Sequence, residues 1–268
     1  MNRVLRFIVV AGAVSGFSRA DTLLSQAYDD MYNLQFETAH QQLSAYEQQH
    51  PADPMGPVSD AAACLFSEFQ RLHILESEFL TNDKKVLNSR QDPDPSVKAR
   101  FNQDLQKTET LTNTQMNVPS ERANAMLAET LRLGLDSDYL ALIEKRNMAA
   151  FSEVKRAREL AEQLLAEYPH NYDAYIALGV ENYLLSQKPA PVRWALRMAG
   201  GETDKENGLA KLRLTAEHGQ YLSPYARLLL AIAALRDGDR DKARELLSWL
   251  ATRYPKNILY RQELAKLQ

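Results

Sequence analysis

The chain has 268 residues, of which 45% are hydrophobic and 25% are charged, and its formal net charge is −3. This composition is typical of a soluble globular protein and makes disorder an unsuitable description. Ala, Leu, Glu, Gln, Lys and Arg dominate while only ten glycines occur, which favours helices because these residues lose little conformational entropy in them. We therefore expect an all-α protein.

The first twenty residues differ from the rest of the chain. Arg3 and Arg6 precede an apolar run over residues 7–14, and the small residues Ser18 and Ala20 follow it. This pattern predicts a signal peptide over 1–20 that is cleaved near Ala20, which would make the mature chain secreted or periplasmic. An ordinary first helix and a membrane anchor are the alternatives. The apolar run is shorter than the roughly 20 residues that a membrane span needs, so we expect no transmembrane span in the mature chain.

Charge argues against a nucleic-acid partner. Cleavage near Ala20 would remove three arginines and no acids, which moves the formal charge from −3 to −6. Basic residues such as Lys155 and Arg156 alternate with acids such as Glu153 and Glu159, whereas binding to a phosphate backbone draws on clustered Lys and Arg. We interpret such segments as solvated helical faces.

Hydrophobic residues recur at three- and four-residue intervals through most of the mature chain and predict a series of helices. They are expected over 21–31, 36–50, 58–80, 97–111, 120–133, 154–185 (two helices separated by Pro169), 209–219, 224–235, 239–253 and 257–267.

Polar and Pro- or Gly-rich stretches separate these helices. Residues 52–57 are expected to form a Pro-rich joint, and 81–96 an exposed loop. Ser120 is expected to cap a helix that ends at a left-handed Gly134, with Ser137 capping the next helix. The helical pattern is interrupted again from Ser186 onward, and a capping box of Thr203 and Glu206 is then expected to begin a new helix.

One set of intervals, which starts at an alanine and ends at a proline, occurs three times. A small residue lets a paired helix approach closely, bulky residues fill the adjacent gap, and Pro cannot continue the helix. The copies are Ala39, Leu43, Tyr46 and Pro51, then Ala157, Ala161, Leu164 and Pro169, then Ala243, Leu247, Leu250 and Pro255. The last two copies are 243 − 157 = 86 residues apart, which equals two periods of roughly 34 residues plus an insertion. We place that insertion at 186–204.

Together with Tyr175, Leu178 and Gly179 on the following helix, this spacing resembles the tetratricopeptide repeat (TPR) family. The resemblance implies antiparallel helix pairs stacked as a TPR-like right-handed α-solenoid, in a single domain over 21–268. The clearest repeats are 21–51, 137–185 and 222–268, and the middle third is helical but divergent. By the same resemblance, Gly179 should face Ala157 and Ala161, so that Leu would overpack there and Ala would be mild.

No residue pattern predicts catalysis or a cofactor. Cys64 is the single cysteine and lies in an apolar stretch, so a buried structural thiol is favoured over a nucleophile. The five histidines show no i,i+4 pairing and no cysteine pair completes a site, so we predict no metal site. Acidic residues that alternate with Lys and Arg along helices are ordinary surface chemistry.

We therefore expect a non-enzymatic scaffold or assembly factor that binds a protein or peptide. The resemblance implies that the first helix of each pair lines a concave binding face, although each residue there also has a packing interpretation. A small-ligand carrier or sensor is the alternative, with a pocket closed by the Trp194 insertion. The oligomeric state stays open. The candidate partner-binding residues are Tyr28, Asp173, Tyr183, Trp194, Arg197 and Tyr225.

Overall fold

The structure is a computed structural model that describes residues 19–75, 92–187, 190–198 and 200–267. All regular secondary structure in these ranges is helical, as expected from the composition. The expected signal peptide lies outside the described residues, apart from its last two positions. The α-helices are α1 (Arg19–Tyr32), α2 (Phe36–Gln49), α3 (Met55–Arg71), α6 (Pro95–Gln115), α7 (Arg122–Leu142), α8 (Asn147–Glu167), α9 (Tyr175–Ser186), α10 (Ala190–Met198), α11 (Lys205–His218), α12 (Ser223–Asp237), α13 (Arg240–Arg253) and α14 (Ile258–Ala265), and a 3-10 turn, η1 (Tyr172–Ala174), precedes α9.

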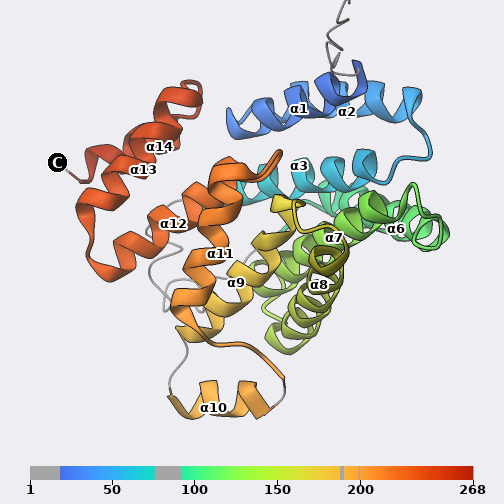
Figure 1. The fold of residues 1–268 in the computed structure, drawn as a ribbon. Helices are drawn as coiled ribbons and strands as arrows, with labels where there is room; N and C mark the ends of the chain where they lie inside the picture. Colours follow the sequence, from blue (N-terminus) through green and yellow to red (C-terminus); the bar gives the residue numbers. More distant parts are fainter. Residues whose placement is uncertain (1–18, 76–91, 188–189, 199, 268) are drawn as a thin grey trace, which may run out of the picture.

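Neighbouring helices pack as pairs along the chain (Figure 1). The pairs are α1 with α2, α3 with α6, α7 with α8, α9 with α11, and α12 with α13, and α14 packs on α13. The middle third therefore follows the same pairing as the rest of the chain. Helix α10 lies between the two members of one pair in the sequence and projects away from the other helices (Figure 1).

Local sequence signals set several helix boundaries. The side chain of Asp94 accepts hydrogen bonds from the backbone N–H groups of Ser96 and Val97 and so caps α6. Asp239 caps α13 in the same way through the N–H of Lys242, at 3.0 Å. Gly238 ends α12 with a φ of 78°, a left-handed conformation that glycine adopts without steric cost.

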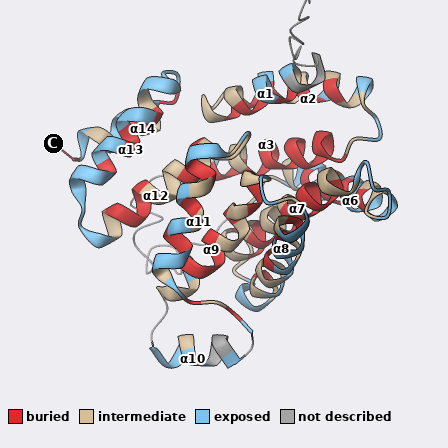
Figure 2. Cartoon of the chain, in the orientation of Figure 1, coloured by how far each residue is buried: buried red, intermediate tan, exposed pale blue. Residues whose placement is uncertain are grey.

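Buried side chains lie on the facing sides of the paired helices (Figure 2). One cluster joins α1, α2, α3, α7 and α8, and it includes Leu43, Met126 and Leu164. Smaller clusters join α3 to α6 and α7, α9 to α11 and α12, and α12 to α13 and α14. The core is thus continuous along the array, as stacking of amphipathic pairs requires.

The predicted boundaries of α3, α6 and α7 are wrong, and α8 begins at Asn147, earlier than expected. Helix α3 begins at Met55 and ends at Arg71, because Pro57 sits in the first turn, where backbone N–H groups need no helical partner, and His73 then takes a positive φ of 57°. Helix α7 runs through Gly134 to Leu142, since the apolar face on both sides of the glycine continues into the core. Helix α6 starts earlier and ends later than expected.

Three predicted caps, at Ser120, Ser137 and Thr203, are also wrong. Ser120 does not cap α7, whose N-cap position is Glu121. Asp204, not Thr203, caps α11, because its side chain accepts from the backbone N–H of Asn207 at 3.0 Å. The Ser137 hydroxyl donates to the carbonyl of Ala150 from within α7. Ser and Asp are comparable caps, so neighbouring candidates could not be ranked from sequence.

The first and last helices of the array are joined by direct hydrogen bonds. The Nδ2 of Asn257 donates to the carbonyl of Tyr32 at 2.9 Å, and the guanidinium of Arg253 lies 3.0 Å from the Asp29 carboxylate. The rings of Tyr32 and Tyr254 also lie 5.3 Å apart. We call this contact between α1 and residues 253–257 the seam. It turns the stack of helix pairs into a closed array.

Gly179 faces α11, not Ala157 and Ala161 as expected. A Cβ at this position would lie 2.8 Å from Cγ and Cδ2 of Leu212 and 3.1 Å from the carbonyl oxygen of Gly208. Leu212 is fully buried and has no room to move. The closest packing of α9 is therefore with its pair partner, and even a methyl group is too large at the contact.

We predict that Gly179→Ala lowers the free energy of unfolding by about 1–3 kcal/mol, because it overpacks the α9–α11 contact. Gly134→Ala is the matched control, since it also lies inside a helix but a Cβ there would meet nothing within 4 Å. It should stabilise the protein by up to about 1 kcal/mol through helix propensity alone. Urea denaturation measures both, and equal effects at the two sites would refute the packing we describe.

Candidate functional site

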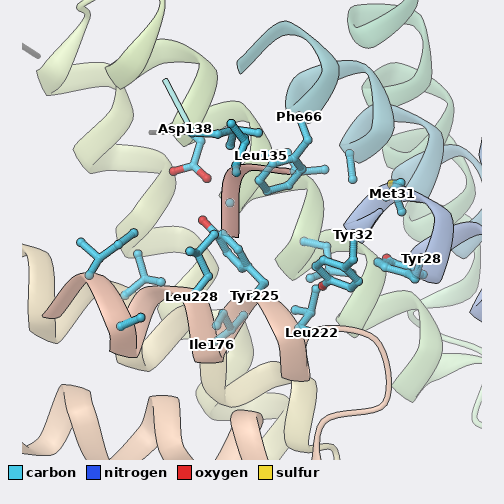
Figure 3. Close-up of a pocket in the computed structure, with 18 of the residues that line it drawn as sticks. Tyr28, Met31, Tyr32, Phe66, Leu135, Asp138, Ile176, Leu222, Tyr225 and Leu228 are labelled. Atoms are coloured by element: carbon cyan, nitrogen blue, oxygen red, sulfur yellow. The ribbon is translucent and has the colours of Figure 1, made fainter. Parts of the chain in front are cut away.

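The first helices of the pairs converge on a central cavity of about 150 Å³ (Figure 3). Most of its walls come from α1, α3, α7, α9, α12 and α14. The seam contributes directly, because Tyr32 and Asn257 both line the cavity. Apolar contacts come chiefly from Met31, Val58, Ala62, Phe66, Leu131, Leu135, Ile176, Ala177, Val180, Leu222, Leu228, Ile232 and Leu259.

Most polar groups on the cavity wall are already bonded to the protein. The hydroxyl of Tyr32 donates to the carbonyl of Tyr221 at 2.8 Å, and the hydroxyl of Thr130 donates within α7 to Met126 at 2.8 Å. Ser59 donates to the Tyr28 hydroxyl at 3.1 Å. These bonds satisfy the groups that would otherwise be costly to bury. They leave a largely apolar surface facing the cavity.

Asp138 and Tyr225 are polar residues of the wall that bond to each other and still face the cavity. Their side chains approach from α7 and α12 and point toward each other (Figure 3), and the Tyr225 hydroxyl donates to the Asp138 carboxyl. Burial without a cationic partner raises the pKa of Asp138 to about 7. Both side chains keep partial accessibility because they face the cavity. The pair can offer a ligand one hydrogen-bonding group in an apolar environment.

The cavity wall is suited to binding. Among the described residues that line it there is no His, Cys, Lys or Arg, so the wall holds neither a strong nucleophile nor a permanent positive charge. Pockets that are mostly apolar, with a few convergent polar groups, are the usual form of small-molecule sites. A cavity of about 150 Å³ lined by aliphatic and aromatic side chains is large enough for a molecule the size of benzene.

Two of the expected binding residues, Tyr28 and Tyr225, lie on the cavity wall. Tyr28 stacks on Tyr221 with ring centroids 4.9 Å apart. Tyr183 instead lies in the core shared by α9, α11 and α12, where it is buried. The six candidates are therefore not gathered in one site.

Asp173 is a structural residue in η1. Its buried carboxylate accepts hydrogen bonds from the backbone N–H groups of Gln220, Tyr221 and Leu222, at 2.9–3.3 Å. These bonds fix the turn between α11 and α12 and so place Tyr221 against α1. Asp173 supports the cavity wall without lining it.

The insertion does not close the cavity. Trp194 lies on α10, is 66% exposed, and is absent from the cavity wall. The side chain of Arg197 lies outside the described residues. The stem that follows α10 is held instead by the buried pair of Arg158 and Glu181, whose Nε and Oε2 atoms are 2.7 Å apart, and by Arg158 donating to the carbonyl of Gly200. The seam residues Tyr32 and Asn257 line the cavity, and Trp194 of the insertion does not.

Sequence reasoning missed Asp138. A signal for it exists, because Leu131, Leu135 and Asp138 recur at three- and four-residue intervals and so share one face of α7. A carboxylate on an apolar helical stripe is unusual. The predicted helix break at Gly134 hid this pattern, since it placed Asp138 at the start of another helix.

Comparison with known proteins gives no relative: no family model matches the chain, nor does a curated protein or a solved structure. None of the described helices has the length and apolar character that crossing a membrane requires. The geometry of the cavity therefore carries the functional argument.

We predict that Asp138 makes the protein less stable as the pH rises from about 4 to 7. In this window the carboxyl is ionised in the unfolded chain but stays protonated in the folded one, because its pKa is raised to about 7, so the folded state binds more protons. Asp138→Asn removes this contribution and keeps an acceptor for Tyr225. The difference in the free energy of unfolding between the variant and the wild type should shift in favour of the variant by at least about 1 kcal/mol from pH 5 to pH 8, since each pKa unit corresponds to about 1.4 kcal/mol. Chemical denaturation at the two pH values measures this difference. If it is the same at pH 5 and pH 8, Asp138 does not have the raised pKa that we assign to it.

Proposed function

We propose that this chain is a non-enzymatic binding protein, built as a TPR-like right-handed solenoid, whose central cavity holds a small apolar ligand with one polar group. The observation that supports the proposal best is the convergence of the first helices of the pairs on one apolar cavity. A peptide would need an open groove along these helices, whereas the seam joins the two ends of the array. Of the two functions expected from sequence, the ligand carrier or sensor is therefore favoured.

The polar group of the ligand faces Asp138 and Tyr225. A carboxyl and a phenol can exchange hydrogen bonds with an alcohol or an amine, and an ionised Asp138 can also pair with a protonated amine. A ligand carboxylate is disfavoured, because it would bring a second negative charge into a site that has no cation on its described wall. The signal peptide expected over 1–20 would place such a carrier outside the cytoplasm.

We predict that Gly134→Leu blocks the site. Gly134 lines the cavity, and a Cβ built there would meet nothing within 4 Å, so we expect the leucine to occupy cavity space. Benzylamine, benzyl alcohol and benzoate are suitable probes because they share a ring and differ in the polar group. Calorimetry should show binding of the amine and the alcohol to wild type, and little of benzoate.

Gly134→Leu should weaken both bound probes by at least about tenfold, which corresponds to about 1.4 kcal/mol. Gly134→Ala, with one methyl group in the same place, should bind nearly as well as wild type. The proposal fails if Gly134→Leu binds as tightly as wild type, or if none of the three probes binds.

A protein or peptide partner is the second candidate, and α10 is the feature that favours it. Val192, Trp194 and Met198 are 44%, 66% and 73% exposed on this short projecting helix, and exposed apolar side chains in one place mark interaction sites. We predict that Trp194→Ala leaves the unfolding midpoint unchanged but abolishes enrichment of a protein partner in affinity capture. Equal enrichment by wild type and variant would remove α10 from consideration.

A further inference from the structure

Three potential metal ligands meet between α2 and α3, away from the central cavity. Asp60 and Cys64 are one turn apart on α3, and His40 faces them from α2. The His40 Nδ1 lies 2.5 Å from the Asp60 Oδ1, and the ligand atoms of all three residues lie within 4.8 Å of one another. Asp60 and Cys64 are buried, and His40 is partly buried.

We propose that His40, Asp60 and Cys64 form a binding site for a divalent transition-metal ion of the Zn²⁺ type. The three donors are an imidazole nitrogen, a carboxylate oxygen and a thiolate sulfur, which is a mixed set suited to Zn²⁺ and Co²⁺ and unsuited to Mg²⁺ or Ca²⁺. Three protein ligands would leave the fourth tetrahedral position for water or another ligand.

The required adjustment is small. Bonds of about 2.0–2.2 Å to nitrogen and oxygen in a tetrahedral site place the two ligand atoms about 3.3 Å apart. The hydrogen bond between His40 and Asp60 would therefore open by less than an ångström. The i,i+4 spacing already puts the Asp60 and Cys64 side chains on the same face of α3, and the Cys64 Sγ lies within 4.8 Å of the other two ligand atoms. A Zn–S bond of about 2.3 Å needs separations of about 3.6 Å, so the Cys64 side chain would have to approach by up to about 1 Å.

Arg100 and Asp104 on α6 form the surroundings of the site. Arg100 contacts the Asp60 Oδ2 at 2.7–2.8 Å and leaves Oδ1 directed to His40, an orienting role that neighbours of metal ligands commonly have. Asp104 is nine-tenths buried beside Asp60 and shares a side-chain hydrogen bond with it. Binding of the ion would release the thiol proton of Cys64, and the Asp60 carboxylate and the Cys64 thiolate would then balance the two positive charges of a divalent cation.

A route from solvent reaches the site. Asp60 and Arg100 also line a surface hollow whose other walls come from Ser44, Glu47, Gln48 and Lys107. A metal ion can enter there without crossing the apolar core. The competing interpretation is that His40, Asp60 and Arg100 form a purely structural hydrogen-bonded network, with Cys64 as a packed thiol, and metal titration separates the two.

The test is titration of the purified, chelator-treated chain with Co²⁺, followed by visible and near-ultraviolet absorption. The proposal expects one equivalent to bind with a thiolate-to-cobalt charge-transfer band, and Zn²⁺ to displace it. Zn²⁺ should also raise the unfolding temperature of the wild type while Mg²⁺ should not. Absence of the charge-transfer band in wild type would overturn the proposal without reference to any variant.

Variants assign the ligands. Cys64→Ser should lose the charge-transfer band, and His40→Gln, which can still donate to Asp60, should bind Co²⁺ at least about tenfold more weakly. His170→Gln is the matched control, because this exposed histidine lies on the connection between α8 and η1, and it should bind as wild type does. Wild-type affinity in both Cys64→Ser and His40→Gln would show that the metal is held elsewhere and that the network is structural.

Discussion

The cavity exists because the seam joins the two ends of the helix array. Helix pairs that only stack on their neighbours form an open curved surface. Here Asp29 pairs with Arg253, and Asn33 accepts from the backbone N–H of Lys256 at 3.1 Å, so the last helices lie against the first. Surface ion pairs are worth little individually. The seam is stabilised by that pair together with the partly buried hydrogen bond from Asn257 to Tyr32 and the packing of Tyr32 on Tyr254.

A buried acid in η1 connects the seam to the middle of the chain. Asp173 holds three successive backbone N–H groups of the α11–α12 turn, and this turn carries Tyr221 to Tyr28 and Tyr32. A carboxylate with several backbone donors can be buried at tolerable cost. Among the described residues, the hydrogen-bond donor to Asp138 is the Tyr225 hydroxyl, and no backbone N–H is found to donate to it. The same residue type therefore anchors the fold at one position and remains open to a ligand at the other.

Most of the helices and their order could be predicted from the sequence, because hydrophobic residues recur at helical intervals. Two predictions were wrong: a short turn was expected around Trp194, where α10 forms, and two helices were expected on either side of Gly134, where α7 is continuous. The sequence did not show which helix faces meet one another. Gly179 was placed against Ala157 and Ala161, but its neighbour is Leu212 across the insertion, and local pattern does not say which helix of the array a small residue faces. Asp138 and the His40–Asp60–Cys64 group depend on contacts between helices, so residue spacing within one helix could not assemble them.

The seam also orders the folding of the chain. Most helix pairs join segments close in sequence, and the exceptions are α3 with α6 and α9 with α11, which longer segments connect. Local contacts of this kind form quickly. The residues that meet at the seam are 221–225 positions apart, so the entropy of closing the intervening chain is recovered only when the pairs between them are in place. We therefore expect the seam to form after the helix pairs and to open before they do. Separation of the two ends with the helix pairs intact would widen the partly open cavity on the side that Tyr32 and Asn257 line.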